Sequence, residues 1–171
     1  APAIAAGCSI VVKPPREAPR TNLLLAQACE DAGIPPGVVN VVTGRSADIS
    51  RHLVLSDIIR KVSLTGSVPV GQEILRLCAE QIKPASMELG GHSPVLVFAD
   101  ANIEQAAEIC ARGKFRNGGQ VCIAASRFFV HEAVLKPFTE HFSAIARSLR
   151  LGNGRDPQTD MGPLGNSRRV T

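Results

Sequence analysis

The amino-acid sequence predicts an α/β fold with an open, mostly parallel sheet. Two observations predict it: short apolar runs rich in β-branched residues recur along the chain, and stretches with apolar residues at helical spacing lie between them. Nearly continuous apolar runs are typical of parallel strands that are buried on both faces. The alternation of strands and helices then indicates layers of helices packed on a sheet.

Five segments are expected to form strands. Four of them are short and almost entirely apolar, and the fifth, which reads SRFFV, has the weakest strand pattern. In chain order they cover residues 9–13, 38–42, 61–64, 94–98 and 126–130.

Four segments carry apolar residues at helical spacing and are expected to form helices. They cover residues 21–32, 70–82, 103–115 and 133–149. The first ends at Gly33 and the two prolines that follow, which are residue types that stop helices. The third follows Asn102, whose side chain suits a helix N-cap.

Gly90 and Gly91 interrupt the second half of the chain. Two adjacent glycines permit a sharp bend, because glycine adopts backbone conformations that other residues avoid. We therefore expect a boundary between two lobes here, with residues 1–89 in the first lobe and residues 90–171 in the second.

The composition excludes several classes of protein. The 171 residues are 44% hydrophobic and 20% charged, which is typical of a globular protein. The net charge is +4, but the basic residues are scattered and Trp and Tyr are absent, which argues against a nucleic-acid partner. No apolar run is long enough to span a membrane, and no signal peptide is evident. We expect a cytoplasmic protein without a membrane partner.

The five cysteines predict neither a disulfide framework nor a metal site, because they are odd in number, far apart and without zinc-binding spacing. Most of them are expected to fill small core positions. Cys122 differs, since it follows the run FRNGGQV directly. Glycines let a reacting carbonyl approach closely, and a backbone N–H beside a cysteine can stabilise an oxyanion. Cys122 is therefore a candidate nucleophile.

Glu88 is a candidate general base, because it lies between the apolar residues Met87 and Leu89. Apolar surroundings raise the pKa of a carboxyl group towards the value that a base needs near neutral pH. A glutamate in an apolar stretch can equally be one half of a buried ion pair, and the sequence leaves both interpretations open.

Two segments are candidates for binding a nucleotide. Gly66 and Ser67 link an expected strand to a helix, and such a turn presents free N–H groups and the positive end of the helix dipole to a phosphate. Lys13 ends the first expected strand, at the edge where ligands of open α/β sheets bind. Either feature alone is also compatible with a purely structural turn or a solvated lysine.

Five segments together resemble the aldehyde dehydrogenase superfamily in wording, order and spacing. They read VVKPPREAP (11–19), AGIPPGVVNVVTG (32–44), LTGSVPVG (64–71), MELGGHSP (87–94) and FRNGGQVC (115–122). Subunits of that family are much longer. The resemblance therefore implies a central fragment, with part of the NAD(P)-binding lobe in residues 1–89 and the N-terminal part of the catalytic lobe in residues 90–171.

The resemblance implies a role for each candidate residue. Cys122 would attack the aldehyde to give a thiohemiacetal and then a thioester, and its backbone N–H would supply half of the oxyanion hole. Glu88 would activate the water that hydrolyses the thioester. The cofactor would be bound by Lys13 at the adenosine ribose, by Gly66 and Ser67 at the pyrophosphate, and by the backbone of Leu89 and Gly90 near the nicotinamide.

Two further positions refine the cofactor and the substrate. Arg16 stands three residues after Lys13, where NAD-preferring members often carry Glu, and a guanidinium favours a 2′-phosphate and hence NADP. Glu17 beside it leaves NAD open. Arg116 stands six residues before the nucleophile, where the succinate-semialdehyde dehydrogenase branch binds the substrate carboxylate. That branch often has a second cysteine where this chain has Ala124, so no redox disulfide is expected.

Three statements about the whole protein follow from the resemblance. The family's oxyanion-hole asparagine and the glutamate of its Glu-x-Phe-Gly-Pro motif fall outside this chain, so the site is incomplete within it. Dimers or tetramers of one subunit type are implied. Two alternatives stay open. The first is an acylating enzyme that uses coenzyme A in place of water, and Glu88 argues against it because a general base serves hydrolysis. The second is a truncated relative that binds nucleotide without catalysis.

Overall fold

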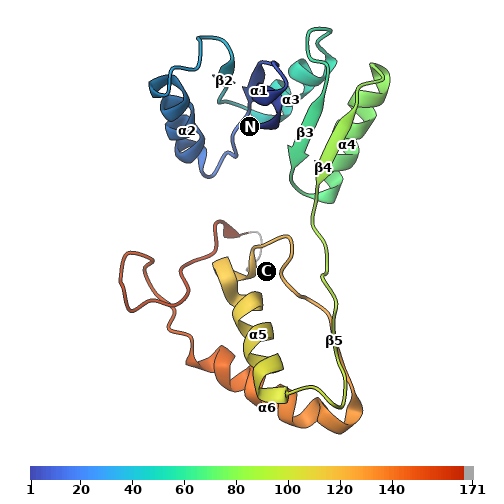
Figure 1. The fold of residues 1–171 in the computed structure, drawn as a ribbon, viewed down its shortest axis with the longest axis vertical. Coiled ribbons are helices and arrows are strands. Elements are labelled where there is room, and N and C mark those ends of the chain that lie inside the picture. The colour runs from blue at the N-terminus through green and yellow to red at the C-terminus, as the bar shows by residue number, and fades with distance from the viewer. Residues whose placement is uncertain (168–171) are drawn as a thin grey trace. The chain divides into compact units, whose positions relative to one another are not determined.

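The computed structural model describes residues 1–167 and has the α/β fold that the sequence predicts, in which α-helices and strands alternate except where β5 (Val95–Val97) follows β4 (Ala85–Glu88) directly (Figure 1). In chain order the elements are α1 (Pro2–Ala5), β1 (Ile10–Val12), α2 (Pro19–Asp31), β2 (Val39–Val41), α3 (Ser46–Leu55), β3 (Val62–Thr65), α4 (Val68–Glu80), β4 (Ala85–Glu88), β5 (Val95–Val97), α5 (Ile103–Phe115), the 3-10 helix η1 (Arg116–Gly119), β6 (Phe128–Val130) and α6 (Glu132–Ser148). Within this part of the chain, no helix combines the length and the apolar character that crossing a lipid bilayer requires.

The six strands form three parallel pairs, β1 with β2, β3 with β4 and β5 with β6. In the three registers, Ile10 lies opposite Val39, Val62 lies opposite Ala85, and Val95 lies opposite Phe128. Among the described residues, no hydrogen-bonded ladder joins one pair to the next. Because two short strands alone are only marginally stable in water, each pair depends on the helices that pack on it.

The chain divides into two compact units, Ala1–Glu88 and Leu89–Thr171. In the first unit, the core lies between α3, α4 and one face of the β3–β4 pair. Its buried side chains are Val54 of α3 and Ile74, Leu77 and Cys78 of α4. They pack on every second residue of the strands, namely Val62, Leu64, Ala85 and Met87, because alternate side chains of a strand share a face.

The core of the second unit lies between α5, α6 and the β5–β6 pair. Val97, Ala107 and Phe138 are buried at its centre. Phe128 of β6 contacts the rings of Phe138 and Phe142 of α6, with ring centroids 6.2 and 5.5 Å apart. These aromatic contacts fasten α6 to the strand pair, since a buried aromatic ring removes a large apolar area from water.

The expected strands and helices are all present, with ends that differ by at most two residues from the structure. Four elements were not predicted: α1, α3, β4 and the 3-10 helix η1. In β4 only Ala85 and Met87 turn towards the core, while Ser86 and Glu88 are exposed, so the segment lacks the continuous apolar run of the other strands. In α3 only Val54 is buried, which leaves a weak helical pattern.

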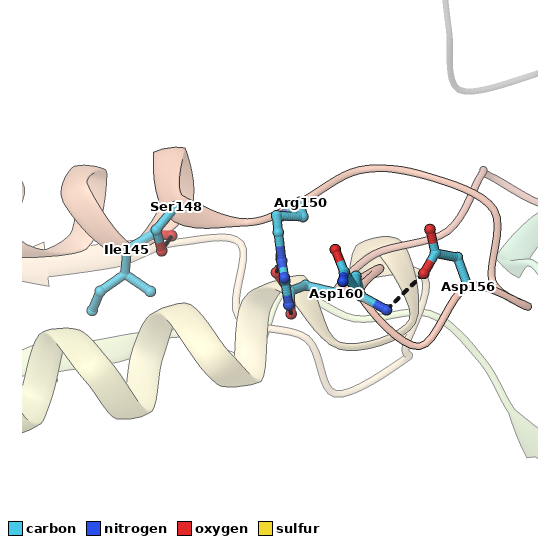
Figure 2. Close-up of polar contacts among 6 residues, drawn as sticks. Ile145, Ser148, Arg150, Asp156 and Asp160 are labelled. Atoms are coloured by element: carbon cyan, nitrogen blue, oxygen red, sulfur yellow. Dashed lines mark hydrogen bonds and ion pairs between the residues drawn. The ribbon is translucent and has the colours of Figure 1, made fainter.

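After α6 the chain forms a closed loop from Arg150 to Met161 (Figure 2). The N–H groups of Asp160 and Met161 both donate to the Arg150 carbonyl, at 2.9 and 3.2 Å. The Arg150 guanidinium also donates to the Asp160 carboxylate, with Nε and Oδ2 3.1 Å apart. Gly152 lies against the opposite side of the loop, where a Cβ would come within 2.6 Å of Thr159 Oγ1. The loop is therefore closed by both main chain and side chain.

Closure of this loop is expected to depend on pH. The hydrogen bond from the Arg150 side chain holds the pKa of the Asp160 carboxyl below its usual value. A carboxyl whose pKa is lower in the folded state stabilises that state above its unfolded pKa, and this contribution is lost as the pH falls through the folded pKa. Hydrogen exchange should therefore show that the Asp160 and Met161 amides lose protection at acid pH before the amides of α5 do.

The matched variants for this test are Asp160→Asn and Asp48→Asn. Asp160→Asn should lower the protection of both amides already at pH 7, because the ion pair with Arg150 is removed. Asp48→Asn removes the partner of Arg45 in another exposed ion pair and should leave the loop unchanged. Equal protection in Asp160→Asn and the unmodified protein would contradict the role of this pair.

Candidate functional site

Lys13 lies at the carboxyl end of β1, where it faces the start of α3. Its Nζ donates to Ser46 Oγ at 3.1 Å and to the Pro14 carbonyl at 2.7 Å. Parallel pairing of β1 with β2 makes this meeting possible, because α3 begins soon after β2 ends at the same edge. Lys13 and Ser46, which are 33 residues apart in the sequence, are thus brought together.

A cavity of about 580 Å³ opens beside this point. It is lined by Arg16 and by the segment Gly44, Arg45, Ser46 and Ala47. Arg45 was not predicted as a site residue, because no motif in the sequence marks it and the helix that follows it, α3, was not predicted either. Two arginines thus line one cavity, and guanidinium groups suit an anionic ligand such as the phosphate of a nucleotide cofactor. Arg45 Nε is also paired with Asp48 Oδ2 at 3.1 Å, so a phosphate bound there would share or replace this ion pair.

Gly66 and Ser67 meet Glu88 at the carboxyl ends of β3 and β4. Thr65 pairs with Glu88 in the ladder, and the Gly66 N–H donates to the Glu88 carbonyl at 3.0 Å. Ser67 is the N-cap of the 13-residue helix α4, and its side chain makes no capping hydrogen bond. The Ser67 hydroxyl and the first N–H groups of α4 can therefore serve a bound phosphate.

Glu88 is the last residue of β4, and its side chain is exposed. The ion pairs among the described residues do not include its carboxylate, so the alternative of a buried ion pair is not seen there. The role of Glu88 as a general base stays a prediction. Leu89 and Gly90 follow Glu88 directly, and Gly90 is also exposed.

The backbone turns sharply in the run before Cys122. Asn117, Gly118 and Gly119 adopt left-handed conformations in succession, with φ values of 54°, 63° and 73°. A Cβ at Gly119 would lie 3.3 Å from the Lys114 carbonyl oxygen. The sequence Asn-Gly-Gly suits this path because these two residue types tolerate positive φ best. Arg116, at the start of this turn, is exposed.

Cys122 occupies the second position of a β-turn that the Ala124 N–H closes by donating to the Val121 carbonyl at 2.9 Å. Its side chain is exposed, and its N–H has no hydrogen-bond acceptor among the described residues. A Cβ at Gly91 would lie 3.8 Å from the Cys122 carbonyl oxygen, so one of the two adjacent glycines lies beside the cysteine. A free N–H next to an exposed thiol is the arrangement that acyl chemistry on sulfur needs.

Cys122 is exposed and differs in this from Cys78 and Cys110. Cys78 is buried, in agreement with the expected core position, and Cys110 is half-buried. Burial raises the pKa of both thiols, which disfavours their reactive thiolate forms. Cys8 is exposed and is therefore not one of the cysteines that fill a core position. The described residues contain no cluster of His, Cys, Asp and Glu that could hold a metal ion.

The structure thus assembles three groups of predicted residues. Lys13 and Arg16 lie at the ends of β1 and β2, while Gly66 and Ser67 lie with Glu88 at the ends of β3 and β4. Both of these groups belong to the first unit. Arg116 and Cys122 lie on the turns that follow α5 in the second unit.

Comparisons with known proteins identify the family of the chain. The model of the aldehyde dehydrogenase family matches residues 1–171. A succinate semialdehyde dehydrogenase of Acinetobacter baylyi is 45% identical over 170 residues, which are 99% of this chain and 35% of that protein. A 3-sulfolactaldehyde dehydrogenase of Pseudomonas putida is 45% identical over 164 residues, which are 96% of this chain and 34% of that protein.

A solved structure gives the same result. The crystal structure of an NADP dependent enzyme from E. coli superposes with a TM-score of 0.94 at 40% identity, covering 97% of this chain and 34% of that one. The chain spans 34% and 35% of the length of these two curated relatives. Since the family match covers every residue and the fold agrees closely, the chain belongs to the aldehyde dehydrogenase family.

Proposed function

We propose that the protein containing this chain oxidises an aldehyde to a carboxylic acid with NAD or NADP, using Cys122 as the nucleophile. The observation that carries this proposal is the exposed Cys122 thiol with a free N–H, held on a turn beside Gly91, in a member of the aldehyde dehydrogenase family. In this proposal, residues 1–89 belong to the cofactor lobe and residues 90–171 begin the catalytic lobe. The family resemblance supports an assembly of two or four subunits.

The Cys122 sulfur attacks the carbonyl carbon and forms a thiohemiacetal, and its N–H stabilises the negative charge that develops on the oxygen. When bound, the nicotinamide cofactor supplies the hydride acceptor. After the oxidation, Cys122 holds the acyl group as a thioester. Glu88 accepts a proton from a water molecule that attacks this thioester, which releases the acid and restores the thiolate.

Arg116 supports a substrate that carries a carboxylate at its far end. It is exposed, and it follows α5 on the same turn that leads to Cys122. A guanidinium recognises a carboxylate through two parallel hydrogen bonds. The relative from Acinetobacter baylyi, a succinate semialdehyde dehydrogenase, agrees with this substrate class. We propose succinate semialdehyde or a similar small semialdehyde.

The cavity beside α3 favours NADP. Arg16 and Arg45 both line it, and Lys13 is held next to it by Ser46. In this proposal, the ribose of the adenosine lies near Lys13, and the 2′-phosphate is bound by the two arginines.

Cys122→Ser and Glu88→Gln should separate the two halves of the reaction in the full-length enzyme. Cys122→Ser should abolish the formation of reduced cofactor, because no thiolate attacks the aldehyde. Glu88→Gln should keep a burst of one reduced cofactor per site and then slow to about 1% of the normal rate or less, as expected for the loss of a general base. Rapid-mixing absorbance at 340 nm, the band of the reduced nicotinamide, measures both.

The same assay, extended by added coenzyme A and by a measurement of NADP binding, decides between the alternatives. A steady rate in Cys122→Ser equal to that of the unmodified enzyme would refute the nucleophile. If coenzyme A accelerates turnover and the acyl thioester accumulates, the enzyme is of the acylating type. If no cofactor is reduced with any aldehyde while NADP still binds, the protein is a non-catalytic nucleotide-binding relative.

Arg116→Met should raise KM for succinate semialdehyde about ten- to a hundredfold, since a hydrogen bond between charged groups is worth about 1.5–3 kcal/mol. The KM for butanal, which is similar in length and has no carboxylate, should not change. Steady-state kinetics with both aldehydes test this directly. An equal rise for both aldehydes would mean that Arg116 supports the turn and does not recognise the carboxylate.

Arg16→Glu and Arg45→Ala should each weaken NADP binding about tenfold or more, because a charged partner of the phosphate is lost. Binding of NAD should change far less. Arg51→Ala, on the same helix α3 but outside the cavity wall, is the matched control. Isothermal titration with each cofactor gives the dissociation constants. Equal losses for NAD and NADP would exclude a 2′-phosphate site in this cavity.

A further inference from the structure

We propose that Gln120 is a positioning residue for Cys122, because its side chain fastens the turn that carries the cysteine to a distant segment, residues 162–165. The inference rests on the proposed function of Cys122 and adds a residue to which the mechanism above gives no role.

One hydrogen bond and one close contact join the two segments. The Gly165 N–H donates to Gln120 Oε1 at 3.2 Å, across 45 residues of sequence. Beside it, Leu164 lies so close to Gly118 that a Cβ there would stand 3.4 Å from Leu164 Cδ2. Residues 162–165 therefore touch the glycine turn at two places, one polar and one apolar.

The turn needs this support because its backbone path is costly. Asn117 adopts φ 54°, a left-handed conformation that non-glycine residues seldom adopt, and two glycines with positive φ follow it. Glycines also lose the most conformational entropy when they are fixed. Within the turn, Gln120 bonds only to Asn117: the Gln120 N–H donates to the Asn117 carbonyl at 3.1 Å, and Asn117 Nδ2 donates back to the Gln120 carbonyl at 3.3 Å.

The segment that holds Gln120 is itself anchored. Met161, the residue before it, closes the loop described above by donating to the Arg150 carbonyl, and it forms a parallel bridge with Leu151. Arg150 follows α6 closely in the chain. The contacts therefore run from the end of α6, through the closed loop and residues 162–165, to the Gln120 side chain.

Gln120 precedes Cys122 by two residues, so a shift of Gln120 displaces both the thiol and the free N–H. An error of about 1 Å in the placement of a reacting group costs on the order of a hundredfold in rate. We call the contacts between residues 162–165 and the turn, made through Gln120 and Gly118, the clamp. The clamp should therefore influence the rate of the chemical step more than the binding of substrate or cofactor.

The test uses the full-length enzyme with three variants. Gln120→Met keeps the length of the side chain but removes the acceptor for the Gly165 N–H. Gln120→Glu keeps an acceptor oxygen and serves as the rescue variant. Gln105→Met makes the same exchange at an exposed position of α5 and is the matched control. The readouts are the rate of the pre-steady-state burst, the KM for aldehyde, the dissociation constant of NADP and the melting temperature.

Gln120→Met should slow the burst about ten- to a hundredfold. Its KM, its NADP affinity and its melting temperature should change little, the last by less than about 4 °C. Gln120→Glu should recover most of the burst rate, and Gln105→Met should match the unmodified enzyme.

Three outcomes would overturn the proposal. The first is a normal burst in Gln120→Met. The second is a burst in Gln120→Glu that is as slow as in Gln120→Met, because the acceptor oxygen would then be irrelevant. The third is a parallel loss of burst rate, NADP affinity and melting temperature, which indicates general destabilisation. Cys122→Ser separates failure of the proposed function from failure of the clamp alone. If Cys122→Ser keeps the burst, both the proposed function and the clamp are wrong. If Cys122→Ser has no burst, the results with the Gln120 variants concern the clamp alone.

Discussion

Parallel strand pairing determines where the candidate residues of the first unit lie. In a parallel pair both carboxyl ends point the same way, so the segments that leave neighbouring strands meet at one edge. Lys13 reaches the first residue of α3 for this reason, and the Gly66 N–H reaches the carbonyl of Glu88. In an antiparallel pair of the same sequences, these groups would lie at opposite ends of the strands.

The sequence predicted the strands and helices that carry a strong apolar pattern, and it failed where the pattern was weak. The segment 103–115 was predicted with its exact limits, because Asn102 caps a regular amphipathic helix. β4 escaped prediction because half of its side chains are exposed and polar. The local turn geometry near Cys122 could be anticipated from Asn-Gly-Gly, since the residue types themselves tolerate positive φ.

Contacts between distant segments could not be predicted in the same way. Arg45 has no motif of its own, and only the fold places it on the cavity wall with Arg16. The bond from Gly165 to Gln120 depends on the path of the chain after α6, which no local pattern encodes. The exposed face of the β5–β6 pair, with Leu96 and Phe129 at 62% and 52% exposure, likewise has no local signal that predicts its surroundings.

The long sequence separation between Gln120 and Gly165 also sets an order of events during synthesis of the chain. The ribosome makes Cys122 and its glycine turn before residues 162–165. Closing a loop of this length also costs conformational entropy, and the contacts within the turn do not offset that cost. The hydrogen bond from Gly165 to Gln120 can therefore form only after Cys122 and its turn have already been made.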